Sequence, residues 1–307
     1  MRDLHTEHFD HRPVLCAVDA GPHGWDVAYA GALIASRLGV PLELLHVARH
    51  SRWRRALRPL GSQDFACDSY RTSAALLARF AAVSPMPTWQ TVREGDASEE
   101  IVLAAEEKRP PVVVLGSRGR SALRSVFGRV SASVTARTSI PTLVISPQAD
   151  PSSLDRDGPV LVGVDGSEAS ARGVDVASEV AVAMGIDLYC LSVAEPRVEV
   201  PVVAAAGASA VVPESPAEIE RRRQASLAAA RDMAFRASDG MAAGALADVG
   251  DPATRLSAVA EEMDACLIVV GHAHRSALDR ALRGSVATSL RRCASRPVLV
   301  AAGNHDV

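Results

Sequence analysis

Residues 159–194 read "PVLVGVDGSEASARGVDVASEVAVAMGIDLYCLSVA", and they align without a gap with residues 13–48, "PVLCAVDAGPHGWDVAYAGALIASRLGVPLELLHVA". Shorter segments repeat further on in the same order: "REGDASEEI" resembles "DVGDPATRL", and "SIPTLVIS" resembles "SRPVLVAA". A repeat on this scale indicates two tandem copies of one domain. We expect three segments, which are copy one (12–147), a linker (148–158) and copy two (159–303).

Each copy alternates short apolar runs with longer helical patterns. In copy one the runs are "VLCAV", "PLELLHV", "TWQTVRE", "VVVLG" and "TLVIS", which we interpret as five strands. Strands that alternate with helices predict a parallel sheet with helices on both faces. The expected fold is α/β, with two tandem five-stranded, Rossmann-like domains. Ligands of such sheets bind beyond the carboxyl ends of the strands.

Capping residues mark several helix boundaries. We expect a helix over Gly24–Leu38, because Gly39 follows it directly. Asp96 and Asp251 are predicted N-caps, as is Ser215 with Glu218 three residues later. The linker stretch "PQADPSSLDRDG" is rich in Pro, Asp and Ser, so we expect an exposed tether.

The composition excludes several classes of protein. The 307 residues are 48% hydrophobic, with a net charge of −3, and we therefore do not expect a nucleic-acid or membrane partner. The basic stretch "RHSRWRRALR" (49–58) is interpreted as a solvated surface. The five cysteines are scattered and the first residues lack a secretory pattern, which favours the cytoplasm. Lys108 is the chain's only lysine and lies outside any glycine loop, so a Walker P-loop is absent.

A glycine loop follows the fourth predicted strand of each copy. In copy two it contains Gly271, two residues, His274, nine residues and then Gly284-Ser285. Glycines allow a phosphate to approach the backbone, and the helix that opens at Ser285 offers free N–H groups and a partial positive charge. Asp165, at the end of the first strand, is able to accept hydrogen bonds from a ribose or a base. The alternative is that these glycines only form tight turns.

Taken together, "VGVDGSEAS", the "GD(P/A)" turn and G-x-x-G-x9-G-[ST] resemble the universal stress protein family in its tandem form. The resemblance implies a five-stranded parallel fold of the adenine nucleotide α-hydrolase-like type. It also implies ATP binding, in one branch of the family, without a Walker lysine. An aspartate and the end of strand two would then lie around the adenosine. The resemblance therefore assigns two sets of nucleotide contacts: Asp165, Val193, Gly271, His274, Ser276, Gly284, Ser285 and Val286 in copy two, and Asp19, Val47, Gly116, Arg118, Gly119, Ser121, Gly128 and Arg129 in copy one.

Both copies depart from the family pattern. Copy one has only eight residues between Gly119 and Gly128, and Arg129 stands where the family has Ser or Thr. Copy two keeps Gly284-Ser285, but His274 replaces the second glycine. We expect a regulatory stress-response protein that binds ATP, with any Mg²⁺ arriving on the phosphates, in at least one copy. The alternative is an interaction and dimerisation scaffold with decayed loops. We expect no enzyme activity beyond a weak ATPase.

The last strands of the two copies, at 142–146 and 298–302, are short, apolar and preceded by proline. A final strand leaves unpaired backbone groups along its outer edge. We therefore expect these two strands to lie at the interface of an intramolecular pseudo-dimer. A homodimer of the whole chain is also expected.

Overall fold

The computed structural model describes seven segments, which are residues 12–48, 63–82, 84–117, 129–195, 215–237, 243–272 and 286–302. The elements of copy one are β1 (Val14–Ala17), α1 (Gly24–Leu38), β2 (Leu42–Ala48), α3 (Gln63–Ala81), β3 (Thr88–Glu94), α4 (Ala97–Lys108), β4 (Val113–Gly116), α5 (Arg129–Arg137) and β5 (Thr142–Ile145). A 3₁₀ helix, η2 (Pro151–Asp155), follows. The elements of copy two are β6 (Val160–Gly163), α6 (Glu168–Met184), β7 (Leu188–Ala194), α7 (Pro216–Ala237), β8 (Ala243–Val249), α8 (Pro252–Glu262), β9 (Leu267–Gly271), α10 (Val286–Cys293) and β10 (Val298–Ala301).

The predicted local signals are confirmed. The first helix has the expected bounds, and Gly39 ends it in the left-handed conformation at φ 67°. Asp96 caps α4 by accepting hydrogen bonds from the N–H groups of Ser98 and Glu99. At the start of α7, Glu218 Oε2 accepts from Ser215 N at 2.9 Å, so the predicted capping box is present.

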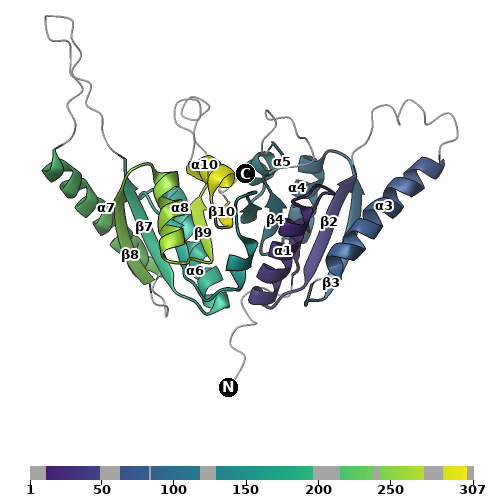
Figure 1. Ribbon diagram of the computed structural model, residues 1–307, viewed down its shortest axis with the longest axis horizontal. Helices are drawn as coiled ribbons and strands as arrows, with labels where there is room; N and C mark the ends of the chain where they lie inside the picture. Colours follow the sequence, from purple (N-terminus) through teal and green to yellow (C-terminus); the bar gives the residue numbers. More distant parts are fainter. Residues whose placement is uncertain are drawn as a thin grey trace, which may run out of the picture.

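The two copies form one ten-stranded sheet, in the order β3-β2-β1-β4-β5-β10-β9-β6-β7-β8 (Figure 1). Strands are parallel within each copy, and the two copies meet through the antiparallel pair β5 and β10. In this pair Val144 lies opposite Val298, and Thr142 lies opposite Val300. The expected five-stranded parallel copies, and their junction through the last strands, are therefore confirmed.

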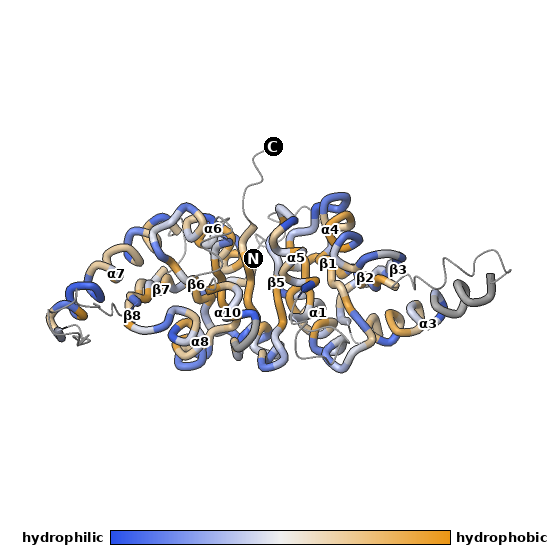
Figure 2. The backbone as a smooth tube through the Cα atoms, turned by 90° about the horizontal axis from the view of Figure 1, so that it is seen from above, coloured by the Kyte–Doolittle hydropathy of each residue, from blue (hydrophilic) through white to orange (hydrophobic). Residues whose placement is uncertain are grey.

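One hydrophobic core runs across this junction. It combines residues of α1 and α3 with residues of α6 and α7, whereas the cores under α4 and α5 and under α8 and α10 belong to one copy each. Figure 2 shows α1 and α3 on one side of the strands and α6 and α7 on the opposite side. The twist of the sheet explains how helices on opposite sides of this view cover one continuous face. The shared core therefore joins the two copies in addition to the strand pairing.

The linker between the copies differs from the expected exposed tether. It folds into η2, which packs against α1, and the side chains of Ser153 and Leu154 are fully buried. Ser153 Oγ donates a hydrogen bond to Cys266 O at 2.8 Å, so the linker is fixed to copy two as well. The Pro, Asp and Ser residues of the linker form the start of this 3₁₀ helix, with Asp150 as its N-cap. The helix brings Leu154 into the shared core.

Arginines reinforce this junction. Arg156 pairs with Asp150 at 2.5 Å and with Asp264 at 2.7 Å, and Arg296 also contacts Asp264 at 2.8 Å. The hydrogen bond from Arg156 holds the pKa of Asp264 below its ordinary value. The pKa of Asp150 is lowered first by the Ser152 hydroxyl and then by the charge of Arg156. The linker therefore carries a charge network that is complete only while both carboxylates are ionised.

A buried carboxylate distinguishes copy one from copy two. The Glu43 side chain is only 3% exposed, accepts a hydrogen bond from Thr91 Oγ1 at 2.7 Å and pairs with Lys108 Nζ at 2.5 Å. At the aligned positions copy two has Tyr189, Leu246 and Met263, which pack against its core. The same place in the fold is thus filled by an ion pair in one copy and by apolar contacts in the other.

We predict that acid weakens the junction. Both folded pKa values are depressed, so this stabilisation is present above the unfolded value of about 4 and is lost as the pH falls through the folded values. Thermal unfolding of the parent and of Arg156→Gln, followed from pH 7 to pH 3, should show a lower Tm for the variant at neutral pH. The difference should shrink towards zero in acid. A constant difference across this range would contradict the account.

We predict that Lys108→Met destabilises the protein by about 2 kcal/mol, because it leaves Glu43 buried without its cation. Glu43→Leu together with Lys108→Met should recover the parental stability, as apolar replacement of a buried pair commonly does. Leucine is used at position 43 instead of the tyrosine of copy two. The Tyr189 ring needs the space beside Gly244, and copy one has Trp89 at the position aligned with Gly244. Urea denaturation measures both variants. Arg223→Met, which removes an exposed pair with Glu220, is the control and should leave the stability close to that of the parent, because exposed ion pairs contribute little.

Candidate nucleotide site

The strand register brings the predicted residues of copy one to one edge of the sheet. Ala17 pairs with Leu45 of β2 and with Leu115 of β4. Asp19, Val47 and Ser117 each follow one of these paired residues by two positions, so they lie at the same level of the sheet. This level is at or just beyond the carboxyl ends of three neighbouring strands. This is the position at which parallel α/β sheets bind ligands. Asp19 and Val47 are both half-buried, so both are accessible there.

Copy two repeats this arrangement. Gly163 pairs with Leu191 of β7 and with Val270 of β9, which places Asp165, Val193 and His272 in the equivalent row. Asp165 is exposed and Val193 is half-buried. The aligned aspartates and valines thus occupy corresponding places in both copies, as the sequence repeat predicts.

Each aspartate also closes the turn that follows its strand. Asp19 Oδ1 accepts a hydrogen bond from Gly21 N at 2.9 Å, and Asp165 Oδ1 accepts one from Ser167 N at 2.9 Å. In copy one the neighbouring imidazole is fixed as well, since His46 Nδ1 lies 2.8 Å from Val18 O. These bonds fix the orientation of both carboxylates just beyond the carboxyl ends of the strands.

Gly271 has a packing role that the sequence alone did not reveal. A Cβ at this position would lie 2.0 Å from the carbonyl oxygen of Ala169, in the first turn of α6. The end of β9 therefore approaches the N-terminus of α6 so closely that only glycine fits. Part of the glycine pattern in copy two thus reflects helix packing. Gly116, the aligned residue, ends β4 opposite Ile145.

A helix follows each glycine loop, α5 in copy one and α10 in copy two. Arg129 is the first residue of α5 and is exposed, and Val286 is the first residue of α10 and is half-buried. A cation in the first turn of a helix is unfavourable for the helix dipole unless an anion lies nearby. The other predicted contacts lie outside the described residues, and these are Arg118, Gly119, Ser121, Gly128, His274, Ser276, Gly284 and Ser285.

Two residues of these rows were not among the predicted contacts. Ser117 and His272 lie at the level of the aspartates, and each donates its backbone N–H to the last strand of its own copy, Ser117 to Ile145 O of β5 at 2.9 Å and His272 to Ala301 O of β10 at 3.2 Å. Ser117 is buried. The signal that would have found them is their place, immediately after the glycine that ends each fourth strand.

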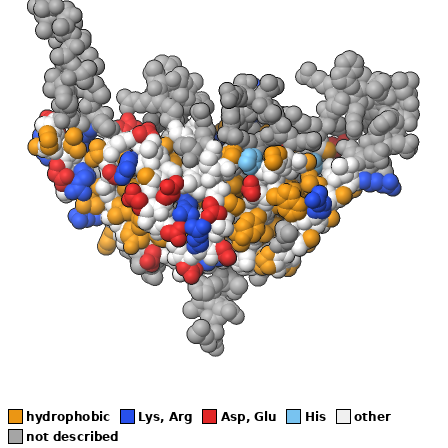
Figure 3. All heavy atoms as spheres, in the orientation of Figure 1, with side chains coloured by type: hydrophobic (Ala, Val, Ile, Leu, Met, Phe, Trp, Pro, Cys, Tyr) orange, Lys and Arg blue, Asp and Glu red, His pale blue; other side chains and the backbone are white. Residues whose placement is uncertain are grey.

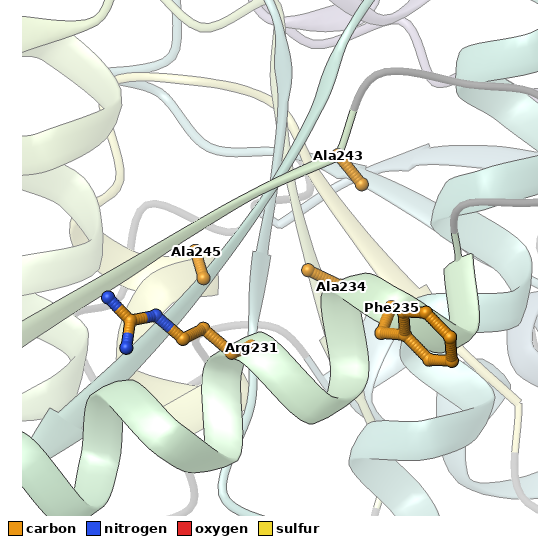
Figure 4. A pocket seen from close by; sticks show the side chains of 5 residues that line it. All are labelled: Arg231, Ala234, Phe235, Ala243 and Ala245. Atoms are coloured by element: carbon orange, nitrogen blue, oxygen red, sulfur yellow. The ribbon is translucent and has the colours of Figure 1, made fainter.

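Other candidate chemistry is weak in the described part of the chain. A hollow of about 340 Å³ lies between α7 and β8, lined by Arg231, Ala234, Phe235, Ala243 and Ala245 (Figure 4). It belongs to the far edge of the sheet and includes none of the predicted contacts. No cluster of metal ligands occurs among the described residues.

The described thiols are also unreactive. Cys16, Cys190 and Cys266 are free and buried. Burial raises the pKa of Cys190 to about 12 and that of Cys266 to about 12, and it raises the pKa of Cys16 further. These three groups therefore remain thiols at physiological pH.

The family model of the universal stress protein family matches the chain twice, over residues 11–146 and 158–302. The chain belongs to this family. A universal stress protein of Mycobacterium tuberculosis (strain ATCC 25618 / H37Rv) is 34% identical over 191 residues, which is 62% of this chain and 61% of the relative. The match thus spans about three fifths of that relative's length. Among the described residues, no helix is long and apolar enough to cross a membrane.

A solved structure of a family member shares the fold of the whole chain. The universal stress protein of Archaeoglobus fulgidus DSM 4304 aligns with 97% of this chain and 98% of its own, with a TM-score of 0.67 at 19% identity. Another universal stress protein, solved in complex with cAMP, aligns with 48% of this chain and 98% of its own at 27% identity and a TM-score of 0.36. The two tandem α/β domains are therefore a known arrangement.

We predict that Gly271→Ala lowers the free energy of unfolding by about 3 kcal/mol, because its methyl group meets backbone atoms that cannot move aside. Gly163→Ala is the matched control: its methyl group meets only side-chain atoms, the ends of Leu256 and Val270, and copy one already has Ala17 at the aligned position. The control should cost less than about 1 kcal/mol. Chemical denaturation in nucleotide-free buffer measures both variants, and equal losses would show that Gly271 is not confined by α6.

Proposed function

We propose that this universal stress protein is a cytoplasmic regulatory protein that binds ATP at the carboxyl-end crevices of one or both copies. The observation that carries the proposal is the repeated row of Asp19 with Val47 and of Asp165 with Val193, level with the strand that leads into each glycine loop. A carboxylate at this point suits the hydroxyls of a ribose or the amino group of a base. The main-chain N–H and C=O groups at the end of the second strand of each copy, near Val47 and Val193, are suited to hydrogen bonds with the edge of an adenine.

The phosphate end of the site rests on the glycine loops and the helices after them. Copy two keeps Gly284-Ser285 directly before α10, so N–H groups at that helix start and a hydroxyl are available for an anion. Copy one has Arg129 at the start of α5 in place of the family's hydroxyl. We therefore propose that copy two holds the phosphates more firmly. Mg²⁺ would enter with the nucleotide, and hydrolysis would be weak at most.

A scaffold function without nucleotide is the second candidate. It is favoured by Gly271, because packing against α6 already explains why this residue is a glycine. It is also favoured by the aspartates, which already bond to their own turns. On this reading the ten-stranded sheet is a rigid platform for partner binding, and the loops have lost their ligand.

We predict that freshly purified protein releases an adenine nucleotide on denaturation and that Gly284→Val abolishes most of it. The branched side chain would block the approach of a phosphate to the loop. Gly128→Val in copy one is the matched control and should retain most of the nucleotide. Mass spectrometry identifies the released ligand, and calorimetric titration with ATP should show affinity at least tenfold weaker for Gly284→Val. Equal binding by Gly284→Val and the parent would sink the assignment of the phosphate site, and no ATP binding by the parent would favour the scaffold.

A further inference from the structure

An aromatic stripe lies on the outer face of α1. Trp25 is 39% exposed and Tyr29 is 41% exposed, and Leu33 is half-buried. Residues spaced four apart lie along one face of a helix. We call Trp25, Tyr29 and Leu33 the α1 patch. Figure 3 shows hydrophobic side chains gathered over α1 on the right of the front face. The patch begins in the first turn of α1, where Gly24 packs against the carbonyl oxygen of Asp19, and it runs from there towards the last turn of the helix.

The patch is held rigid from below. The Trp25 ring packs edge-on against Phe80 of α3, with ring centroids 4.5 Å apart and an interplanar angle of 80°. The Arg79 guanidinium lies 5.5 Å from the centroid of the Trp25 ring. Preorganised Trp, Tyr and Arg side chains are the residues that contribute most to protein interfaces, since little conformational entropy is lost when they are covered.

The second copy lacks this patch. At the aligned positions α6 carries Ala171, Asp175 and Glu179, of which the two acidic residues are exposed. The two helices otherwise bury similar faces in the same shared core. Because both helices solve the same packing problem, the fold does not require aromatic residues on the outside of α1. The packing of Trp25 on Phe80 contributes to stability within the chain, but it does not explain why the outer part of Trp25 and the Tyr29 ring remain exposed side by side.

The α1 patch adjoins the interface that already joins the two copies. The same helix packs against η2 and against α6, and Arg37 in its last turn pairs with Asp157 of the linker at 3.1 Å. An apolar surface that continues from an established interface is suited to a further copy of the same chain. An isologous dimer would place one α1 patch on the other, so that Trp25 and Tyr29 of each chain are covered together.

We propose that the α1 patch is the surface through which two copies of this chain form a closed homodimer. The acidic face of α6 supports a second copy as the occupant. The two helices lie on opposite sides of the strands in Figure 2, so their outer surfaces are separate. If both were aromatic, each chain would have two self-associating faces and would assemble into open chains. Asp175 and Glu179 repel their own counterparts, so association stops at two. The inference does not depend on nucleotide binding.

The test is the oligomeric state of the full chain, measured by sedimentation equilibrium at about 50 µM protein, in the range where modest interfaces assemble. The parent should be a dimer. Trp25→Ala with Tyr29→Asp, which installs the residues of copy two, should be monomeric or associate at least tenfold more weakly. Adding Leu33→Glu to these two substitutions should weaken association further. If this triple variant does not fold, the result for Trp25→Ala with Tyr29→Asp decides the question. Trp89→Ala removes a more exposed tryptophan from β3 and should leave the dimer intact.

A reciprocal variant tests the closure of the dimer. Ala171→Trp with Asp175→Tyr and Glu179→Leu gives copy two a patch of its own, and this protein should form species larger than a dimer. A monomeric parent, or a dimer that survives Trp25→Ala with Tyr29→Asp, would overturn the proposal. Loss of the dimer in Trp89→Ala would point to the sheet edge instead. A reciprocal variant that remains a dimer would refute the role given to the acidic face.

Discussion

The antiparallel pairing of β5 with β10 is the constraint on which the rest of this molecule depends. A parallel five-stranded sheet ends in a strand with unpaired backbone groups, and a buried edge of this kind is costly. Here each final strand satisfies the other, with Val144 opposite Val298. The pairing also brings α1 and α6 into one core, and that core in turn requires the linker to fold against it. Sheet, core and linker are thus consequences of one contact.

Duplication has left two solutions to each local problem in a single chain. The place filled by Glu43 and Lys108 in copy one is filled by apolar side chains in copy two, which shows that the ion pair is not demanded by the fold. The outer face of α1 is aromatic where that of α6 is acidic. Differences of this kind separate what the architecture requires from what a particular copy does, because the backbone context is shared.

Much of the fold followed from the sequence because its signals are local. The strands, the helix over Gly24–Leu38 and the Asp96 cap depend on residues only a few positions apart. The junction of the last strands was predictable too, since an apolar strand after a proline needs a partner. The packing of η2 was not: Leu154 is buried by elements of both copies, which no local pattern reports. The Glu43 and Lys108 pair joins residues far apart in the chain and escaped notice for the same reason.

The two ends of the proposed site, the row of aspartates and valines and the glycine loops, could be predicted from the sequence to different degrees. The aspartates and valines follow strand ends, so their level in the sheet could be worked out from the repeat and is borne out by the register. The glycines carry a double meaning, because Gly271 is confined by Ala169 whether or not a phosphate binds. A glycine in a binding motif is therefore evidence for a ligand only after its packing role is subtracted. The same subtraction applies to the paired row at the carboxyl ends, because each aspartate accepts a hydrogen bond from its own turn and each valine packs against the core of its own copy. The evidence that bears on a ligand is therefore the shared level of these residues with the strand that leads into each glycine loop, and not the presence of any one of them.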